Sequence, residues 1–383
     1  MERGTEGGEE GAKNTKRVII TSMLRAVIKI FSGLILFLAF LTLLSFNFKP
    51  DIQELLPKQK RISGRGIYVT AYVAQLPVRF NALKDAAKRA GLNTMVIDAK
   101  EVISQPYLAL ARQRKLTPEV KAAPSPWLAK LANDLHQDGL RLTARIVVFK
   151  DDHLVLARPD LGVHLNGGLY RDRKGGKWAD PYSDEVRLYN ELIAESAAQS
   201  GVDEVQFDYI RFPAEGSARY ANYPHQKEGV SRVDIICEFL KGARQRVAKY
   251  NTSLAVDIFG VTAWQSKVDI ETLGQDLKRM APYLDVISPM LYPSHFHNGY
   301  DGYANPGSYP YYFIHTGLLK AQELLSGETT ALVPWLQGFN MKSPNYGPNY
   351  IREQVRACDD AKVAGFLVWN ARNVYDVTFD ALR

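Results

Sequence analysis

Two aspartates near the carboxyl ends of neighbouring predicted strands are the residues whose type and spacing best suit chemistry. Asp208 lies in the run at 203–212, and Asp257 lies in the run at 253–260. Because side chains alternate along a strand, each aspartate faces away from the apolar residues that flank it. Neighbouring strands are about 4.8 Å apart, so we expect the two carboxyl groups about 5–6 Å apart. That separation is close to the one that retaining glycosidases use.

Hydrolysis of a glycosidic bond requires an ionised carboxylate at the anomeric carbon and a protonated carboxyl at the leaving oxygen. Two crowded acids drive their pKa values apart, which supplies one of each. We assign Asp208 as the nucleophile or cation stabiliser and Asp257 as the general acid/base. The alternative for each is the common role of an aspartate at a strand end, which is to cap a loop or form an ion pair.

Eight short β-branched runs that alternate with helical segments would position these aspartates. The runs lie at 66–73, 94–100, 141–149, 203–212, 253–260, 286–293, 330–338 and 365–371, and the helices lie at about 80–90, 125–138, 184–200, 231–249, 269–281, 311–325 and 349–363, with a last one from Val374. The pattern predicts an α/β fold, a (β/α)8 TIM barrel, over 65–383. An open doubly wound sheet is the alternative, but no Gly-x-Gly-x-x-Gly motif follows the first run.

Active sites of such barrels lie at the carboxyl ends of the strands, where axis-facing side chains meet. The alternation places eight further candidates for substrate binding around this opening: Asp98, Lys100, Arg145, Tyr292, Trp335, Gln337, Trp369 and Asn370. Only one of the last two is expected to point inward. The long segments 150–183, 213–230 and 294–310 all follow strands, so they would lie on the same face.

Each candidate has a role and an alternative. Arg145 would keep Asp208 ionised. Asp98 and Lys100 would bind sugar hydroxyls, or pair with each other inside the barrel. The aromatic side chains would stack on sugar rings, or else belong to the core. Arg211 follows Asp208 by three residues, so it is expected to face the opposite side as a structural residue.

Composition and spacing limit the other classes of function. The 383 residues carry a net charge of +7 without a run of Lys or Arg, so no nucleic-acid binding is expected. His295 and His297 have the spacing of a metal pair, but no third ligand accompanies them, and we predict neither a metal nor a cofactor. Cys237 and Cys358 lie in predicted helices and are expected to be buried thiols.

The amino-terminal segment is expected to attach the barrel to a membrane. Residues 1–16 are polar and without pattern, and residues 1–25 are expected to form a disordered cytoplasmic tail. Residues 26–46 are apolar and long enough for a transmembrane helix. Basic residues precede this stretch and no small-x-small cleavage site follows it, which favours an uncleaved signal anchor with a cytoplasmic amino terminus. Residues 47–64 would then be a linker, and the catalytic domain would be periplasmic or extracellular.

Motifs along the predicted strands and loops form a recognisable set. They are GIYVTAYV (66–73), MVIDAK (95–100), ARIVVFKD (144–151), GLYRDRK (168–174), WADP (178–181), EVQFDYIRFP (204–213), ISPMLYPSH (287–295) and LVWNA (367–371). Together they resemble a bacterial family of glycosyl hydrolase domains, over nearly all of 65–380. The resemblance implies a TIM barrel of the glycoside hydrolase type, exported or tethered to a membrane. One departure is that 100–102 keeps a single acid where the family often has an acidic pair.

The expected function is hydrolysis of O-glycosidic bonds in an envelope or extracellular polysaccharide, carried out by Asp208 and Asp257. The expected partners are the polysaccharide or oligosaccharide substrate and the membrane. The alternative is a non-catalytic glycan-binding or scaffold barrel at the cell envelope. A barrel of that kind is expected to lose one of its two acids, and both are present here, which favours the enzyme.

Overall fold

A ring of parallel strands forms the centre of the structure, a computed structural model that describes residues 64–383. Its strands are β1 (Arg65–Val69), β2 (Thr94–Asp98), β3 (Arg141–Val147), β6 (Glu204–Asp208), β7 (Ser253–Phe259), β8 (Val286–Met290), β9 (Ala331–Leu332), β10 (Trp335–Gln337) and β11 (Phe366–Trp369). They pair in the order β10-β11-β1-β2-β3-β6-β7-β8-β9, and β10 also pairs with β8. This extra pairing closes the ring, so the predicted (β/α)8 barrel is confirmed.

The seventh strand of the barrel is made of two pieces. The run predicted at 330–338 is divided into β9 and β10, with Val333 and Pro334 between them. Proline has no backbone N–H, so it cannot donate to the ladder at that point. Trp335 nevertheless lies opposite Met290 of β8 and Leu367 of β11, which keeps its indole inside the ring.

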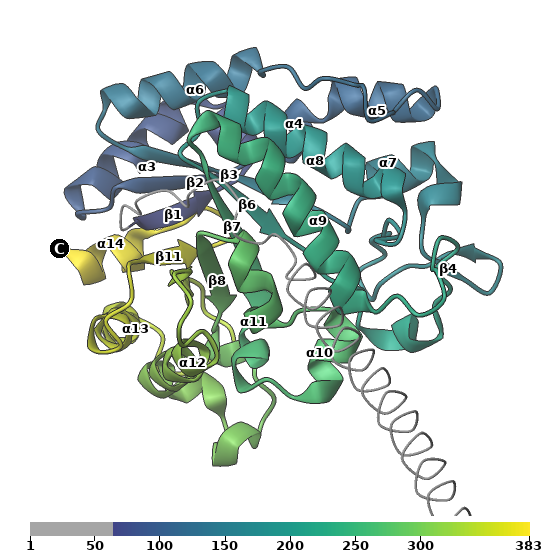
Figure 1. The fold of residues 1–383 in the computed structure, drawn as a ribbon. Helices are drawn as coiled ribbons and strands as arrows, with labels where there is room; N and C mark the ends of the chain where they lie inside the picture. The colour runs from purple at the N-terminus through teal and green to yellow at the C-terminus, as the bar shows by residue number, and fades with distance from the viewer. Residues whose placement is uncertain (1–63) are drawn as a thin grey trace, which may run out of the picture. The chain divides into compact units, whose positions relative to one another are not determined.

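Helices surround the ring (Figure 1). The helices that follow the barrel strands are α3 (Pro77–Arg89), α6 (Pro126–Gln137), α8 (Asp184–Gln199), α9 (Arg232–Val247), α11 (Leu277–Met280), α12 (Pro310–Leu324), α13 (Pro348–Asp360) and α14 (Asp376–Leu382). Further helices precede them in the same connections: α2 (Ala71–Ala74), α4 (Lys100–Ile103), α5 (Gln105–Arg112), α7 (Asp152–Ala157) and α10 (Lys267–Leu273).

The helix predicted at 269–281 is divided into α10 and α11. Gly274 ends α10 with a φ of 76°, a left-handed conformation that glycine adopts without a Cβ clash. Asp276 then caps α11, because its side chain accepts a hydrogen bond from the Arg279 N–H. The periodicity of the sequence therefore gave the right helical region but missed its break.

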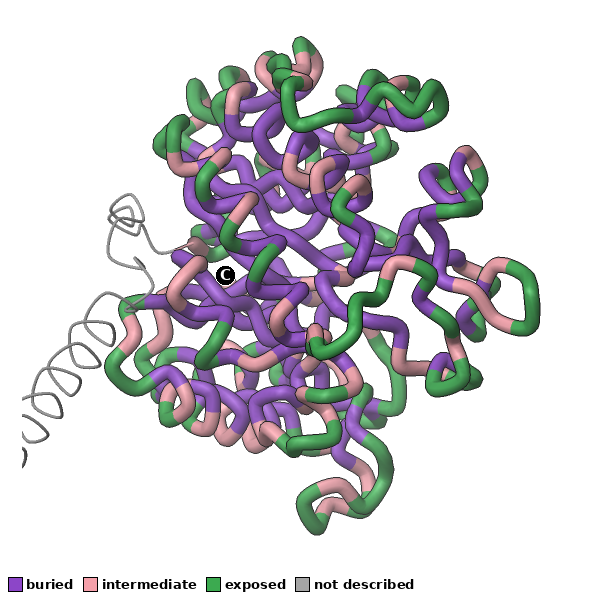
Figure 2. The backbone as a smooth tube through the Cα atoms, turned by 45° about the vertical axis from the view of Figure 1, so that its right-hand side comes forward, coloured by how far each residue is buried: buried purple, intermediate pink, exposed green. Residues whose placement is uncertain are grey.

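Buried stretches of the chain fill the centre of the structure, and exposed stretches lie at its periphery (Figure 2). The buried apolar side chains form two layers. Val205 and Phe207 of β6 belong to the larger layer, between strands and helices. A smaller layer fills the ring and consists of Tyr68, Val96, Ala255, Val286, Tyr292, Val333, Trp335 and Leu367. The predicted alternation in β6 is confirmed, since the Gln206 amide points inward and donates to Ser288 Oγ at 3.1 Å.

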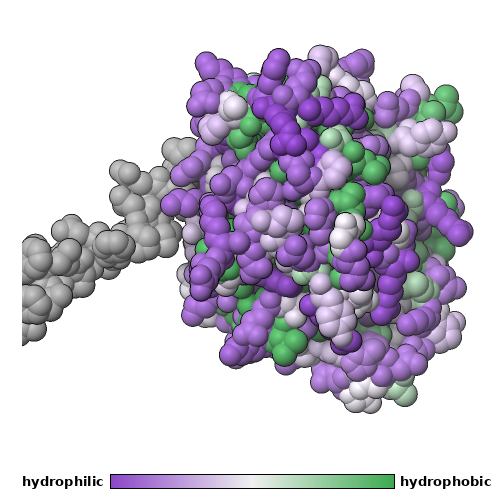
Figure 3. Space-filling view, turned by 90° about the vertical axis from the view of Figure 1, so that its right-hand side faces the viewer, coloured by the Kyte–Doolittle hydropathy of each residue, from purple (hydrophilic) through white to green (hydrophobic). Residues whose placement is uncertain are grey.

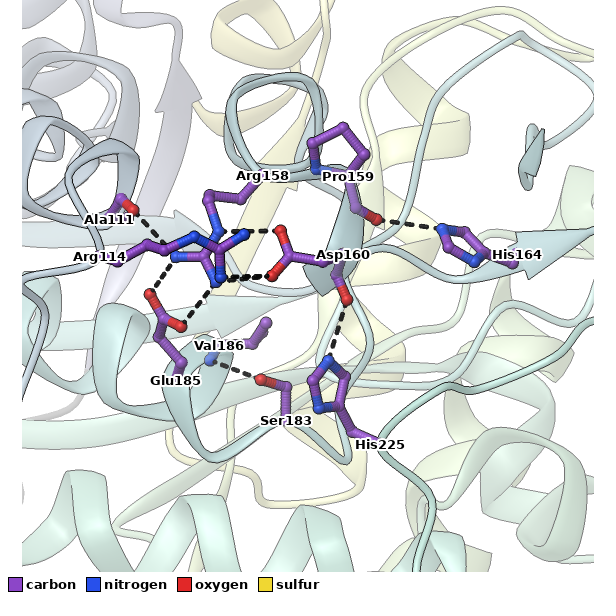
Figure 4. A network of polar contacts seen from close by, with 10 residues as sticks. All are labelled: Ala111, Arg114, Arg158, Pro159, Asp160, His164, Ser183, Glu185, Val186 and His225. Carbon is purple, nitrogen blue, oxygen red and sulfur yellow. Dashed lines mark hydrogen bonds and ion pairs between the residues drawn. The ribbon is translucent and has the colours of Figure 1, made fainter. Parts of the chain in front are cut away.

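The long segment between β3 and α8 has secondary structure of its own and is held by ion pairs and hydrogen bonds. It contains α7 and a hairpin of β4 (His164–Leu165) and β5 (Gly168–Leu169). Arg158 pairs there with Asp160 and with Glu185 at the start of α8, both at 2.7 Å (Figure 4). The His225 ring, from the segment between β6 and α9, lies 2.9 Å from the Asp160 carbonyl oxygen. Two loops on the carboxyl face are therefore fixed to each other.

The predicted tail (1–25), anchor (26–46) and most of the linker (47–64) lie outside the described residues. Within 64–383, no helix has the length and apolar character needed to cross a bilayer. The two cysteines, Cys237 and Cys358, are buried free thiols, as expected.

Candidate active site

One arginine connects the acids at the carboxyl end of the ring. Arg145 of β3 contacts Asp98 of β2 through Nη1 and Asp208 of β6 through Nη2. Its Nε lies 4.0 Å from Asp257 Oδ2 of β7. Strand register explains this arrangement. Arg145 lies opposite Asp98, and Phe207 lies opposite Val256. Phe207 and Val256 each come one residue before a catalytic candidate. The structure thus brings Asp208 and Asp257 to one guanidinium, as expected for side chains that face the barrel axis from neighbouring strands.

Asp257 is held in an environment that favours its protonated form. It is 2% exposed, and its Oδ1 accepts a hydrogen bond of 2.6 Å from Trp335 Nε1. Burial and the nearby charge of Asp208 raise the pKa of Asp257 well above its ordinary value, although Arg145 opposes them. A carboxyl group of this kind can deliver a proton at neutral pH.

Asp208 has the opposite surroundings. Its Oδ2 contacts the Arg145 guanidinium, and its Oδ1 accepts a hydrogen bond of 2.6 Å from the Tyr209 backbone N–H. Both contacts stabilise a negative charge on the carboxylate. The two acids therefore differ in their surroundings: the contacts of Asp208 stabilise a negative charge, whereas Asp257 is buried beside an indole N–H.

Aromatic rings lie beside the guanidinium. Tyr68 and Trp369 stack with ring centroids 3.9 Å apart, and the Arg145 guanidinium lies 4.9 Å from the Trp369 ring. The Tyr68 hydroxyl donates a hydrogen bond to Asp98. Trp335 packs edge-on against Trp369 at 5.5 Å. These contacts fix the plane of the guanidinium and so the positions of both acids.

A cavity of about 480 Å³ opens above these residues. Six of the predicted residues line it: Arg145, Asp208, Asp257, Tyr292, Trp335 and Trp369. Its other polar and aromatic lining comes from residues that the sequence did not single out for this role: Lys174, Tyr209, Arg211, Glu215, Phe259, His295 and Phe296. The side of the molecule that carries β4, α7 and α10 is largely hydrophilic, with small hydrophobic areas between polar ones (Figure 3).

Tyr292 is a predicted aromatic residue whose hydroxyl is affected by the two acids. It is 5% exposed and belongs to the apolar layer inside the ring. Burial, followed by the charges of Asp257 and Asp208, raises the pKa of its hydroxyl well above the ordinary value. The phenol is therefore a neutral hydrogen-bond donor toward the cavity.

Arg211 is placed differently from the prediction. It lines the cavity instead of facing away from it, between the rings of Trp178 and Phe259 at 4.8 Å and 4.1 Å. The physical reason is Tyr209, whose φ of 53° ends the strand and its alternation directly after Asp208. The same turn brings the Tyr209 side chain into the cavity lining.

Lys100 does not reach the main cavity. Strand β2 ends at Asp98, and Lys100 begins α4, so the inward alternation stops before it. Its Nζ pairs with Asp151 Oδ2 at 2.8 Å and donates to Asn190 Oδ1 at 2.9 Å. It also donates to the Val148 carbonyl at 2.9 Å. With these donors engaged, Lys100 fixes the start of the β3–α8 segment and is not available to sugar hydroxyls.

Asp98 lies at the border of the site. It pairs with Arg145 and lines a smaller cavity of about 190 Å³ that also touches Lys100 and Arg145. Its side chain is 25% exposed. The alternative ion pair with Lys100 does not form, because each of the two has another partner.

Gln337 and Asn370 are structural in this geometry and do not line the main cavity. Gln337 is fully buried; its Oε1 accepts from the Ser294 N–H at 3.2 Å, and its Nε2 donates to Ser343 Oγ at 3.0 Å. The Asn370 amide donates to the carbonyls of Gly338 and Val374 at 2.6 and 2.8 Å. Of the pair at the end of β11, Trp369 is thus the one that faces the cavity.

The two histidines with metal-like spacing do not converge. His295 lines the cavity, and its Nδ1 lies 3.3 Å from Ser294 Oγ. His297 Nδ1 lies 2.9 Å from the Asn298 carbonyl oxygen. In the described part of the chain, no group of three or more His, Cys, Asp or Glu side chains could hold a metal ion.

Several solved structures of glycoside hydrolases share this barrel fold. The glycoside hydrolase domain of PgaB (BpsB) from Bordetella bronchiseptica has a TM-score of 0.58 at 13% identity, over 84% of this chain and 98% of that one. The α-galactosidase TtGalA from Thermus thermophilus has a TM-score of 0.52 at 12% identity, over 85% and 61%. The endo-β-1,4-mannanase from Thermotoga petrophila has a TM-score of 0.51 at 14% identity, over 82% and 72%. At these identities the likeness is one of fold.

No curated protein matches the chain in sequence. A family model described as "putative glycosyl hydrolase domain" matches residues 66–375, which include every strand of the barrel except the first residue of β1. Because this match spans most of the sequence, the chain belongs to that glycosyl hydrolase domain family.

Proposed function

We propose that the protein hydrolyses O-glycosidic bonds in an envelope or extracellular polysaccharide, with Asp208 as nucleophile and Asp257 as general acid/base. The observation that carries the proposal is the placement of two carboxyls of opposite character on one guanidinium, at the floor of a cavity. Family membership and the barrel fold support the reaction class. The polysaccharide and its location rest on the predicted anchor at 26–46, which would export the domain at 65–383.

In the first step, Asp257 donates its proton to the leaving oxygen while the Asp208 carboxylate attacks the anomeric carbon. The new charge on Asp257 develops 4.0 Å from Arg145 Nε, a buried N–H without a hydrogen-bond partner. A donor that is already oriented toward a developing charge stabilises the transition state without rearrangement. Arg145 can thus stabilise the negative charge on Asp208 before this step and the negative charge on Asp257 after it.

In the second step, a water molecule attacks the glycosyl ester on Asp208, and Asp257 takes the proton of this water. Burial is the first cause of the raised pKa of Asp257, and the charge of Asp208 is the second. Forming the ester neutralises Asp208 and removes the second cause, which lowers the pKa of Asp257 and favours the ionised form that acts as a base. Residues on adjacent strands suit the short separation of a retaining enzyme, about 5–5.5 Å.

The test uses the full-length protein in detergent on a panel of envelope and storage polysaccharides, with release of reducing ends as the readout. Asp208→Asn and Asp257→Asn should each lower turnover by roughly 100-fold to 10,000-fold, the usual contribution of such groups. Asp85→Asn, at an exposed position on α3, is the matched control and should leave turnover unchanged.

Proton NMR of the first anomer released should show retention of configuration. Equal turnover by wild type and both site variants would refute the proposed roles. Glycan binding by the wild type without hydrolysis of any member of the panel would instead favour the non-catalytic barrel.

A further inference from the structure

The cations of the main cavity are not equivalent. Arg145 contacts Asp98 and Asp208, and Arg211 pairs with Glu215 at 3.0 Å. Among the described residues, no carboxylate lies within 4.0 Å of Lys174, which also lines the cavity and is exposed. Lys174 is therefore the lining cation whose charge is not already balanced by a neighbouring acid.

Two more basic groups come from other loops: His295 lines the same cavity, and Lys342 lies close enough for its charge to act on the His295 ring. His295 comes from the segment after β8 and lies against the rings of Tyr292 and Phe339 at 5.1 and 5.9 Å. Lys342 comes from the segment after β10 and is exposed. Partial burial is the main cause that lowers the pKa of His295. The charges of Lys174 and Lys342 act on the ring and lower this pKa further. We call Lys174, His295 and Lys342 the cationic wall, in which the two lysines carry the charge and His295 is the group that gains a proton when an anion binds.

The lysine on the β3–α8 side is held by an ordered turn. The buried Asp172 accepts hydrogen bonds from the N–H groups of Lys174 and Gly176 at 2.9 and 3.0 Å. Its other oxygen pairs with Lys150 at 2.7 Å. Lys174 is thus presented at the cavity by a fixed backbone.

The other two members of the wall are fastened by one buried residue. Gln337 accepts from the Ser294 N–H, directly before His295, and donates to Ser343 Oγ, directly after Lys342. Three loops therefore bring basic groups together: Lys174 and His295 line the cavity, and the charge of Lys342 acts on His295, while the acids at the cavity floor are paired. An anionic group of a ligand would find uncompensated positive charge there and nowhere else in the lining that the structure describes.

We propose that the cationic wall binds an anionic substituent, a carboxylate or a phosphate, on the glycan beside the cleaved bond. This inference rests on the proposed function and deepens it, because it names the substrate class. Bound anion would favour the protonated form of His295, so affinity should rise as the pH falls from 8 to 6. The neutral sugar rings themselves would be held by the aromatic lining.

The test measures binding to the full-length Asp257→Asn protein in detergent, so that its readout does not depend on hydrolysis. Glucose, D-glucuronate and glucose 6-phosphate serve as neutral, carboxylate and phosphate probes in calorimetric titrations. At least one anionic probe should bind about fivefold or more tightly than glucose, and Lys174→Gln with Lys342→Gln should remove that preference. Lys121→Gln, an exposed lysine outside the wall, should retain it.

The two anionic probes identify which substituent fits. The proton NMR signal of His295, assigned with His295→Gln, should move toward the protonated position when the preferred anion is added. If neither anionic probe binds more tightly than glucose, or if the preference survives in the double lysine variant, the inference is wrong. If the wild type hydrolyses no polysaccharide of the panel while the anion preference is intact, the proposed function alone is wrong.

Discussion

Replacing Arg145 by methionine tests the geometry on which the site depends. The change removes the guanidinium that contacts Asp98 and Asp208 and faces Asp257, and it retains an apolar chain against Tyr68 and Trp369. Removing one partner of a buried ion pair costs about 3–5 kcal/mol, because the remaining charge is left without compensation.

The structure indicates where this loss arises. The Asp98 side chain is 25% exposed, so water can replace part of its lost partner, whereas Asp208 is 9% exposed. We therefore expect Arg145→Met to lower the free energy of unfolding by about 3–5 kcal/mol near pH 7, mainly through Asp208. Arg145→Met/Asp208→Asn should recover much of the loss, since the second change removes the uncompensated charge.

The loss should also depend on pH. Arg145 lowers the pKa of Asp257, which burial and Asp208 raise, so without the arginine this pKa rises further. A carboxyl whose folded pKa exceeds its unfolded value stabilises the fold at low pH, and this stability disappears as the pH rises above the unfolded value of about 4. The deficit of the variant should therefore shrink toward pH 4.

Urea unfolding of the full-length protein in detergent, followed by tryptophan fluorescence at pH 4.5 and 7.5, measures these effects. Two results would refute the reasoning. One is a loss below about 1 kcal/mol in Arg145→Met, the size of a surface ion pair. The other is a double variant whose loss equals the sum of the two single losses, which would mean that the residues are not coupled.

Three further predictions concern stability and its dependence on pH. Asp257→Asn keeps an acceptor for Trp335 and removes a carboxyl whose folded pKa is raised, so by calorimetry it should melt above the wild type at pH 7 but not near pH 3.5. Burial raises the pKa of Glu204 to about 7, so Glu204→Gln should stabilise the fold by roughly 3 kcal/mol at pH 8 and have no effect near pH 4; equal urea midpoints at pH 8 would contradict this. A Cβ at Gly260 would meet the Met290 carbonyl oxygen at 2.5 Å, so Gly260→Ala should cost about 1–3 kcal/mol in urea unfolding and lower turnover; unchanged values for both would show that the site can adapt.

The centre of the site could be predicted because its members lie within regular strands. Arg145, Asp208, Asp257 and Trp335 each belong to a strand, where alternation fixes the direction of the side chain. Hydrophobic pattern and strand spacing therefore carried enough information to name both acids and the arginine between them.

Residues one or two positions beyond a strand could not be predicted in the same way. The left-handed backbone at Tyr209 redirects Arg211 into the cavity, and the helical backbone at Ala99 turns Lys100 away from it. Both conformations depend on contacts with distant parts of the chain. Lys174 reaches the site through a turn fixed by Asp172, which no periodicity in the sequence indicates.

The buried amide of Gln337 has a consequence for redesign of the protein. Because it ties the backbone near Ser294 to the hydroxyl of Ser343, two loops are connected through a single side chain below the surface. Grafting either loop from a relative would succeed only if the graft brought a backbone N–H or a hydroxyl to the same place. Conversely, residues between these fixed points, such as His295 and Lys342, can be exchanged without disturbing the connection, which makes them practical positions for engineering new sugar preferences.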